Sequence, residues 1–316
     1  MRAMVALMAS LPLATLSEDV TTFYTIRDSD GADVDRALVK LSVKEKYKSA
    51  LPYVKTSYVE HSSISDDHGR AQIKFPCWDG SFYATVEKDG YYPAEIGRVD
   101  LMQKPDEKHE KFWILPSKEI DVLLRKMVNP VPMYCHSRNI HSMRLHSPKG
   151  TLGYDLEKGD WVAPFGRGSV SDFNIEYDWV LTNGVFKGEG KLVFIEPGAG
   201  AYKRKMLVGN AFRIDYQADT NEVFRPSYPF SSYGNVKKVE SREKRILEND
   251  EFLVMRTRVV VDSAGRVIKA NYSHIEGPFS ISNEMSYKFS SFNPAVNDTN
   301  LEYSPDKNLV PFKERR

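Results

Sequence analysis

Asn129-Pro130-Val131-Pro132-Met133-Tyr134 divides the chain. Its two prolines each lack a backbone N–H and hold φ fixed, and each biases the preceding residue toward an extended conformation. We therefore expect a stiff, extended joint here. The hydrophobic run 120–127 ends just before it. On the amino side of the joint the sequence predicts one compact β-domain, and on the carboxyl side a longer β-rich unit.

Length and composition agree with two folded domains. The chain has 316 residues, which exceeds the usual size of one domain, and its 41% hydrophobic content is typical of a folded protein. The formal net charge of +1 gives no electrostatic reason to expect nucleic acid as a partner. Two local basic clusters, 203–205 and 237–238, are interpreted as solvated surface, although a local role stays open.

The first 17 residues have the pattern of a secretory signal peptide. Arg2 precedes an apolar run from Ala3 to Leu16, and small residues surround its end. The alternative is a disordered or mis-started amino terminus. No other stretch is long enough to span a bilayer, so we expect no membrane span. The prediction is an exported protein, periplasmic or extracellular.

Two cysteines occur, Cys77 and Cys135. In an exported protein they are able to pair, and the bridge would stabilise the chain by about 4 kcal/mol on the chain-entropy model. Sequence cannot place their Cα atoms within bonding reach, so two separate thiols are the equal alternative.

Alternating polar and apolar residues predict the strands of the first domain. Turn signatures separate them, among them residues 28–31, 66–69 and 88–90. The segment 120–127 could be a helix, but apolar residues two apart and the lack of a capping box favour a strand. The predicted strands cover residues 23–27, 37–43, 71–75, 81–87 and 120–127.

Three segments of this domain, taken in order, resemble one known family. They are Asp28-Ser-Asp-Gly-Ala-Asp-Val-Asp-Arg-Ala-Leu-Val39, then Ser65-Asp-Asp-His-Gly-Arg-Ala71, then Val86-Glu-Lys-Asp-Gly-Tyr-Tyr-Pro93. The pattern is similar to the transthyretin-like, or carboxypeptidase-regulatory-like, domain and covers about residues 20–127. The resemblance implies a β-sandwich that serves as an accessory or spacer module in exported proteins and rarely carries chemistry.

The joint, residues 153–162 and residues 300–303 are also similar to a group of bacterial proteins expected to be exported, which have no assigned activity. This likeness implies a shared two-domain unit. The predicted division is a signal peptide over 1–17, a transthyretin-like sandwich over 18–127, a proline-stiffened linker over 128–150 and an antiparallel β-domain over 151–316.

Two hairpins are the clearest elements of the second domain. Apolar residues two apart in 173–181 and 186–194 flank the tight turn Thr182-Asn183-Gly184. A second pair, 253–261 and 268–272, flanks the turn 262–265, and residues 285–292 predict another strand. The tail beyond Asn293 is expected to wrap the domain as an extended segment. The fold class is therefore all-β.

One candidate metal site is the group Cys135, His136, His141 and His146. Thiolate and imidazole are ligands that zinc prefers. The spacing matches no zinc-finger pattern, and ordinary loop histidines explain the residues equally well. The sequence otherwise predicts no cofactor.

A second candidate site combines carboxylates with aromatic residues in a glycine-rich stretch: Tyr154, Asp155, Asp160, Trp161 and Phe165. Paired carboxylates on an aromatic platform suit a sugar site or a glycosidase. The alternative is a set of turns over a buried indole.

No serine-hydrolase or metalloprotease signature occurs, so no catalytic residue is assigned. A scattered triad that uses His274 cannot be recognised from sequence. The preferred hypothesis is a non-catalytic recognition or structural protein that binds carbohydrate or another envelope protein. The alternative is a hydrolase acting on glycans or peptides, with Asp155 and Asp160 or a metal in the catalytic role.

Overall fold

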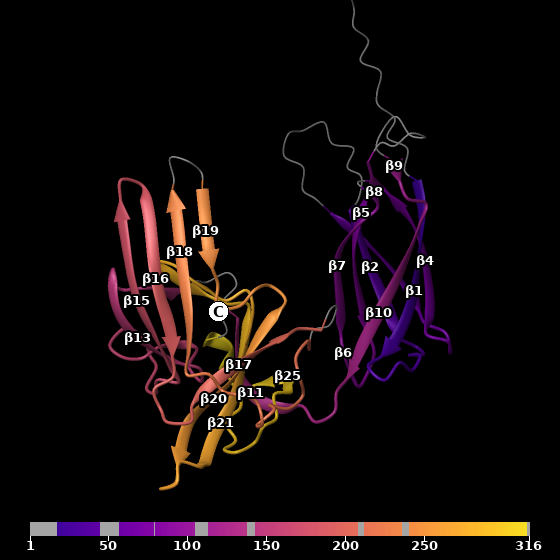
Figure 1. Ribbon diagram of the computed structural model, residues 1–316. Coiled ribbons are helices and arrows are strands. Elements are labelled where there is room, and N and C mark those ends of the chain that lie inside the picture. Colours follow the sequence, from indigo (N-terminus) through magenta and orange to yellow (C-terminus); the bar gives the residue numbers. More distant parts are fainter. Residues whose placement is uncertain are drawn as a thin grey trace, which may run out of the picture. The chain divides into compact units, whose positions relative to one another are not determined.

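The computed structural model describes residues 18–44, 57–78, 80–104, 113–137, 143–207, 212–235 and 240–314. Within these residues the regular structure is β-strand apart from the short 3-10 helix η1 (Phe312–Glu314), which confirms the predicted all-β class. Two compact units divide between Met127 and Val128 (Figure 1). No helix in the described ranges has the length and apolar character needed to cross a membrane. The predicted signal peptide lies outside the described residues.

Unit 1 contains two four-stranded sheets. The first has the order β4-β1-β10-β6 and the second β3-β2-β5-β7. The strands of the first sheet are β4 (Arg70–Cys77), β1 (Glu18–Asp28), β10 (Ser117–Lys126) and β6 (Tyr91–Tyr92). Those of the second are β3 (Tyr58–Ile64), β2 (Leu38–Lys44), β5 (Ser81–Glu87) and β7 (Ala94–Asp100), and a separate pair is formed by β8 (Met102–Gln103) and β9 (Trp113–Ile114).

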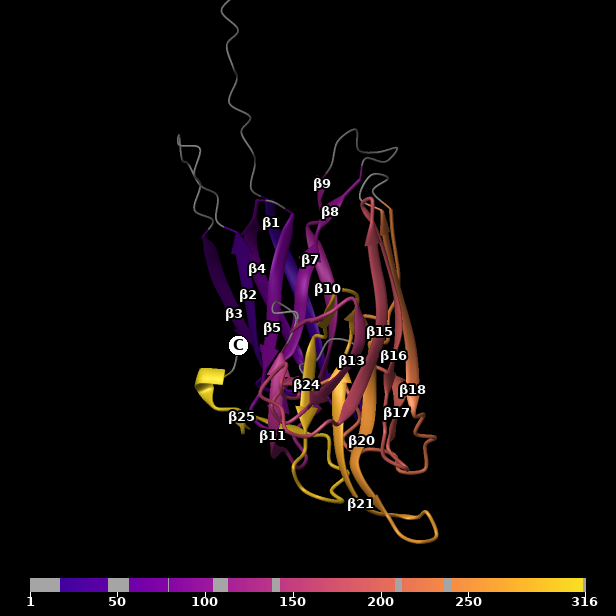
Figure 2. The same cartoon turned by 90° about the vertical axis from the view of Figure 1, so that its left-hand side faces the viewer.

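The two sheets of unit 1 pack face to face. Strand β4 alternates strictly between exposed and buried residues, as the sequence predicted. Phe75 of β4 meets Phe82 of β5 edge to face, with ring centroids 5.3 Å apart, so the two sheets share one core. Figure 2 shows these strands from the side. This β-sandwich agrees with the fold that the resemblance implied, while membership of the transthyretin-like family stays a prediction.

Unit 2 is built on two six-stranded sheets. One has the order β17-β20-β21-β24-β11-β25, and the other, here the groove sheet, has the order β14-β13-β15-β16-β18-β19. The first contains β17 (Gly200–Lys205), β20 (Glu251–Val261), β21 (Val267–Glu276), β24 (Phe289–Phe292), β11 (Val131–Ser137) and β25 (Tyr303–Asn308). The groove sheet contains β14 (Asp160–Trp161), β13 (Lys149–Asp155), β15 (Phe173–Thr182), β16 (Val185–Val193), β18 (Ser227–Asn235) and β19 (Glu240–Lys244). A small sheet combines β12 (Met143–Arg144), β23 (Glu284–Ser286) and β22 (Ser280–Ile281).

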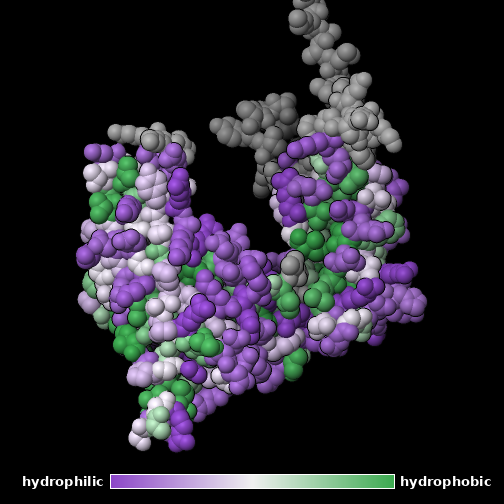
Figure 3. All heavy atoms as spheres, in the orientation of Figure 1, coloured by the Kyte–Doolittle hydropathy of each residue, from purple (hydrophilic) through white to green (hydrophobic). Residues whose placement is uncertain are grey.

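The predicted hairpin of unit 2 is confirmed as β15 and β16. Its two turn residues, Asn183 and Gly184, have φ of 52° and 79°, which is the conformation that a two-residue primed turn requires. The distal end of the hairpin extends past the core, where Val180 and Leu181 are exposed. Figure 3 shows hydrophobic atoms at this end of unit 2. The second predicted hairpin is confirmed as β20 and β21.

The predicted linker over 128–150 is wrong in its central part. Residues 131–137 form β11, which pairs with β24 and β25 inside unit 2. Pro132 is tolerated because it is exposed and lies where the pairing register with β25 shifts. The stiff, extended conformation was predicted correctly, but its backbone is used in a sheet.

The tail was expected to be extended, but it also contributes a strand. β25 pairs with β11 in parallel, and Glu302 just before it binds the start of unit 2. The Glu302 carboxylate accepts hydrogen bonds from the backbone N–H groups of Val128 and Asn129 at 2.8 and 2.7 Å. The Asn300 side chain donates to the Asn129 carbonyl at 2.8 Å. These bonds satisfy the backbone next to the prolines, which cannot donate themselves.

The disulfide considered for Cys77 and Cys135 is not formed. Both residues are thiols, Cys77 buried in unit 1 and Cys135 buried in unit 2. Each thiol behaves as a small apolar core residue of its own unit.

Candidate functional site

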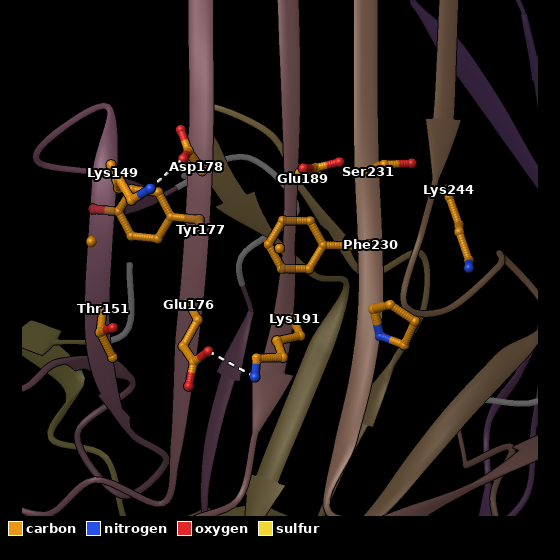
Figure 4. A pocket seen from close by; sticks show the side chains of 13 residues that line it. Lys149, Thr151, Glu176, Tyr177, Asp178, Glu189, Lys191, Phe230, Ser231 and Lys244 are labelled. Atoms are coloured by element: carbon orange, nitrogen blue, oxygen red, sulfur yellow. Dashed lines mark hydrogen bonds and ion pairs between the residues drawn. The ribbon is translucent and has the colours of Figure 1, made fainter.

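A shallow groove of about 650 Å³ crosses the exposed face of the groove sheet. It runs over β13, β15, β16, β18 and the end of β19 (Figure 4). Because neighbouring strands lie about 4.8 Å apart, the groove spans roughly 19 Å. That length suits an extended ligand rather than a small compact one.

The groove lies between two rows of side chains. Pairing across the strands sets both rows, and strand alternation points them to the same face. Figure 4 shows the rows on either side of the Tyr177 and Phe230 rings. The upper row is Lys149, Asp178, Glu189, Ser231 and Lys244, and the lower row is Thr151, Glu176, Lys191 and Pro229.

The floor between the rows is made by Gly150, Tyr177, Gly190 and Phe230, which pair in that order. Tyr177 and Phe230 are 6% and 4% exposed, so their rings point into unit 2 and anchor the sheet there. A Cβ on Gly190 would lie 2.6 Å from the Phe230 ring, so glycine is required for that ring to pack. The floor therefore presents mainly backbone and C–H groups to a ligand.

The walls of the groove carry charges of both signs. The Lys149 ammonium lies 2.7 Å from the Asp178 carboxylate, and Lys191 lies 2.9 Å from Glu176 (Figure 4). The hydrogen bond that the Lys149 ammonium donates to the Asp178 carboxylate, followed by the negative charge of that carboxylate, raises the pKa of Lys149. Since these groups remain open to water, they contribute little to stability and stay available to a ligand.

Two of the three aromatic residues of the predicted platform, Tyr154 and Trp161, are not on the surface, whereas Phe165 is 48% exposed. Tyr154 is fully buried, and its hydroxyl lies 2.6 Å from the hydroxyl of Tyr287. Trp161 is 2% exposed and donates from its indole nitrogen to the Arg144 carbonyl at 3.2 Å. Their rings meet edge to face at 5.5 Å. Tyr154 and Trp161 therefore cannot form the predicted sugar platform, and for them the alternative of turns over a buried indole holds.

The two predicted carboxylates hold turns together. Asp155, 1% exposed, accepts from the backbone N–H groups of Glu157, Lys158, Ser169 and Val170 at 2.9–3.3 Å. Asp160 accepts from the N–H groups of Trp161 and Arg167 and pairs with the Arg167 side chain at 3.1 Å. Every one of these contacts fixes the 155–170 segment itself.

Arg258 of β20 joins this segment to the other sheet, which sequence reasoning missed. Its guanidinium pairs with Asp155, Glu157 and Asp172 at 3.2, 3.0 and 2.9 Å, and it lies over the Phe292 ring. Burial raises the pKa of Asp172, although the Arg258 guanidinium opposes the rise. Burial would also raise the pKa of Glu157, but hydrogen bonds from Arg258 and Lys158 outweigh it and lower that pKa.

This geometry separates a structural role of Asp155 from a catalytic one. Asp155→Asn places an amide donor against backbone N–H donors and removes a charge from Arg258. We expect a loss of about 2–3 kcal/mol in the free energy of unfolding, measured by urea denaturation. Asp160→Asn, at a partly exposed turn, is the matched control and should cost less. A stable Asp155→Asn protein that lost a measurable glycan-hydrolysing activity would contradict this assignment and favour a hydrolase.

The candidate metal ligands have separate roles. His136 is buried, and its Nε2 lies 3.0 Å from the Glu157 carbonyl, whereas His146 stacks on Phe165 at 4.9 Å. His141 lies outside the described residues. Within the part of the chain that the structure describes, no three His, Cys, Asp or Glu side chains are grouped as a metal site would need.

A buried Ser291, His274 and Glu276 arrangement superficially resembles a triad. The Ser291 hydroxyl lies 2.7 Å from His274 Nδ1, and His274 Nε2 lies 3.7 Å from Glu276. Burial would raise the pKa of Glu276, but His274 and Arg213 outweigh it and lower that pKa. Ser291 and His274 are both 0% exposed, so a substrate cannot reach them. The group acts as an internal polar network.

Comparison with known proteins gives no family. No protein-family model matches the chain, and no curated protein matches it. A solved "putative carbohydrate binding protein" from Bacteroides uniformis aligns over 89% of this chain and 99% of its own, with 9% identity and a TM-score of 0.21. Chlorocatechol 1,2-dioxygenase from Pseudomonas putida aligns over 35% of this chain and 61% of its own, with 10% identity and a TM-score of 0.25. The chain thus spans less than two thirds of that dioxygenase, and at these TM-scores neither likeness carries an argument about function.

Proposed function

We propose that the protein binds a carbohydrate polymer in the groove of unit 2 and does not cleave it. The observation that carries this proposal is the pair of polar rows on either side of a flat floor. Expected export of the chain is part of the same proposal, since it would bring the groove into contact with extracellular glycans.

The chemistry of the groove suits sugar hydroxyl groups, each of which both donates and accepts hydrogen bonds. Carboxylates of Glu176, Asp178 and Glu189 accept, ammonium groups of Lys149 and Lys191 donate, and such charge-assisted bonds are the stronger kind. The floor offers C–H surface on which the apolar face of a sugar ring can pack. An open trough also lets a polymer pass through at both ends.

The environment of the carboxylates favours binding over hydrolysis. A glycosidase needs one carboxylic acid held protonated in a dry environment beside a second carboxylate. Glu176 and Asp178 are 41% and 48% exposed and are paired with lysines. Neither carboxyl group therefore lies in the dry environment that such an acid needs.

The proposal is tested by native gels cast with single polysaccharides: β-glucan, xylan, mannan, pectin and chondroitin sulfate. We expect at least one polysaccharide to retard the migration of the intact protein. The retardation should saturate as the polysaccharide concentration rises, and soluble oligosaccharide of the same type should compete with it. The released reducing ends, measured on the same samples, should stay at the background level. Unretarded migration on every polysaccharide, together with no binding on a glycan array, would overturn the proposal.

A further inference from the structure

A second pocket, of about 510 Å³, opens at the β19 end of the groove and is strongly basic. Pro229 and Lys244 line both cavities, so the two adjoin each other. We infer that this pocket binds a carboxylate or sulfate group of the polymer, so that the ligand is an acidic polysaccharide. This inference rests on the proposed function of the groove and narrows its ligand.

The charge balance of the pocket favours an anion. Among the described residues, its lining holds the cations of Lys203, Arg225, Lys244 and Arg245 and one carboxylate, that of Glu222. Glu222 is bound to Arg204, at 2.5 Å, and Arg245 is bound to Glu243, at 2.8 Å.

Within the part of the chain that the structure describes, three cations of the pocket have no carboxylate partner. Lys203, Arg225 and Lys244 take part in no ion pair among the described residues. Like charges around one cavity repel, and an anion placed between them would be attracted by all three.

Backbone pairing fixes the chain segments that carry these cations. Lys203 belongs to β17 and Lys244 to β19, and Arg225 exchanges two backbone hydrogen bonds with Ala201, at 2.7 and 3.0 Å. The Lys203 ammonium lies 5.5 Å from the centre of the Tyr228 ring, whose hydroxyl donates to the Ala201 carbonyl at 2.7 Å. The buried Tyr202 and Tyr228, with Val223 and Pro229, form the apolar part of the lining. The backbone of the pocket is therefore held in place before an anion binds.

In Figure 4, Lys244 lies at the opposite edge of the groove from Lys149. A polymer that fills the groove from β13 toward β19 therefore reaches the basic pocket at its end. Neutral sugars would occupy the groove, and a charged substituent would occupy the pocket.

The test compares the intact protein with a Lys203→Met/Arg225→Met variant, which leaves both rows of the groove unchanged. Affinity is measured for polygalacturonate, for its methyl-esterified form and for chondroitin sulfate. We expect the variant to lose about 10- to 100-fold in affinity for the acidic polymer that the intact protein binds. Affinity for the esterified form should be unchanged, and the acidic affinity of the intact protein should fall as salt rises.

Lys205→Met/Arg266→Met removes the same charge from solvated positions of unit 2 and is the matched control; it should bind like the intact protein. Equal affinity of the intact protein for acidic and esterified polymers would overturn the inference and leave the proposed function standing. Equally tight binding of single-stranded DNA, or competition by inorganic sulfate at low millimolar concentration, would also overturn the inference. Either result would show that the pocket binds anions in general rather than an acidic polysaccharide. Failure to bind any polysaccharide would instead overturn the proposed function.

Discussion

Replacing Arg258 by Met should lower the free energy of unfolding of unit 2 by about 3–5 kcal/mol at neutral pH. Met retains much of the packing against Phe292 but leaves the carboxylates of Asp155 and Asp172, 1% and 0% exposed, without their cation. For a unit of this size the midpoint of thermal unfolding should fall by roughly 10 °C. Urea denaturation and calorimetry measure both quantities.

The loss in the free energy of unfolding caused by Arg258→Met should become smaller as pH is lowered. Burial raises the pKa of Asp172 in the folded state, and removing the guanidinium removes the largest effect that opposes that rise. A carboxyl whose folded pKa exceeds its unfolded pKa binds protons more tightly when folded, so stability increases as pH falls through the folded pKa. Arg266→Met, which removes an exposed ion pair with Asp262, is the control and should leave the midpoint unchanged. A pH-independent deficit, or an Arg258→Met protein as stable as the parent, would contradict this account.

Replacing Glu176 by Gln together with Lys191 by Met should weaken polysaccharide binding about 10- to 100-fold. The two side chains form one ion pair in the middle of the lower row, so changing both leaves no uncompensated charge. Because both are exposed, the fold should be unaffected. Titration calorimetry with the polysaccharide that retards the intact protein measures the change in Kd.

The control for this groove variant is Asp19→Asn/Lys74→Met, which removes a comparable exposed ion pair in unit 1. It should bind like the intact protein. If both double variants bind with equal affinity, the lower row does not contact the ligand.

The sequence predicts local structure well where one face of a strand is buried. Strands β4 and β5 were predicted from alternation alone, and the Asn183-Gly184 turn from its residue types. β25 was missed because its Ser-Pro-Asp-Lys-Asn sequence is typical of a loop. Its pairing with β11 depends on residues about 170 positions away, which periodicity cannot reveal.

The candidate site was harder to predict than the fold. Asp155 and Asp160 were noticed because they stand beside Trp161, but their role depends on backbone N–H groups and on Arg258, which is 103 residues distant from Asp155. The groove residues Glu176 and Lys191 were overlooked as the polar face of a hairpin. Their register across β15 and β16 was available from the predicted turn, and it would have placed opposite charges side by side.

Carboxyl footprinting with a water-soluble carbodiimide, with and without the retarding polysaccharide, tests the central claim most directly. Binding in the groove predicts reduced labelling of Glu176, Asp178 and Glu189, with unchanged labelling of the exposed Asp30 and Asp250. Unchanged labelling of all three groove carboxylates under saturating polysaccharide would contradict the account.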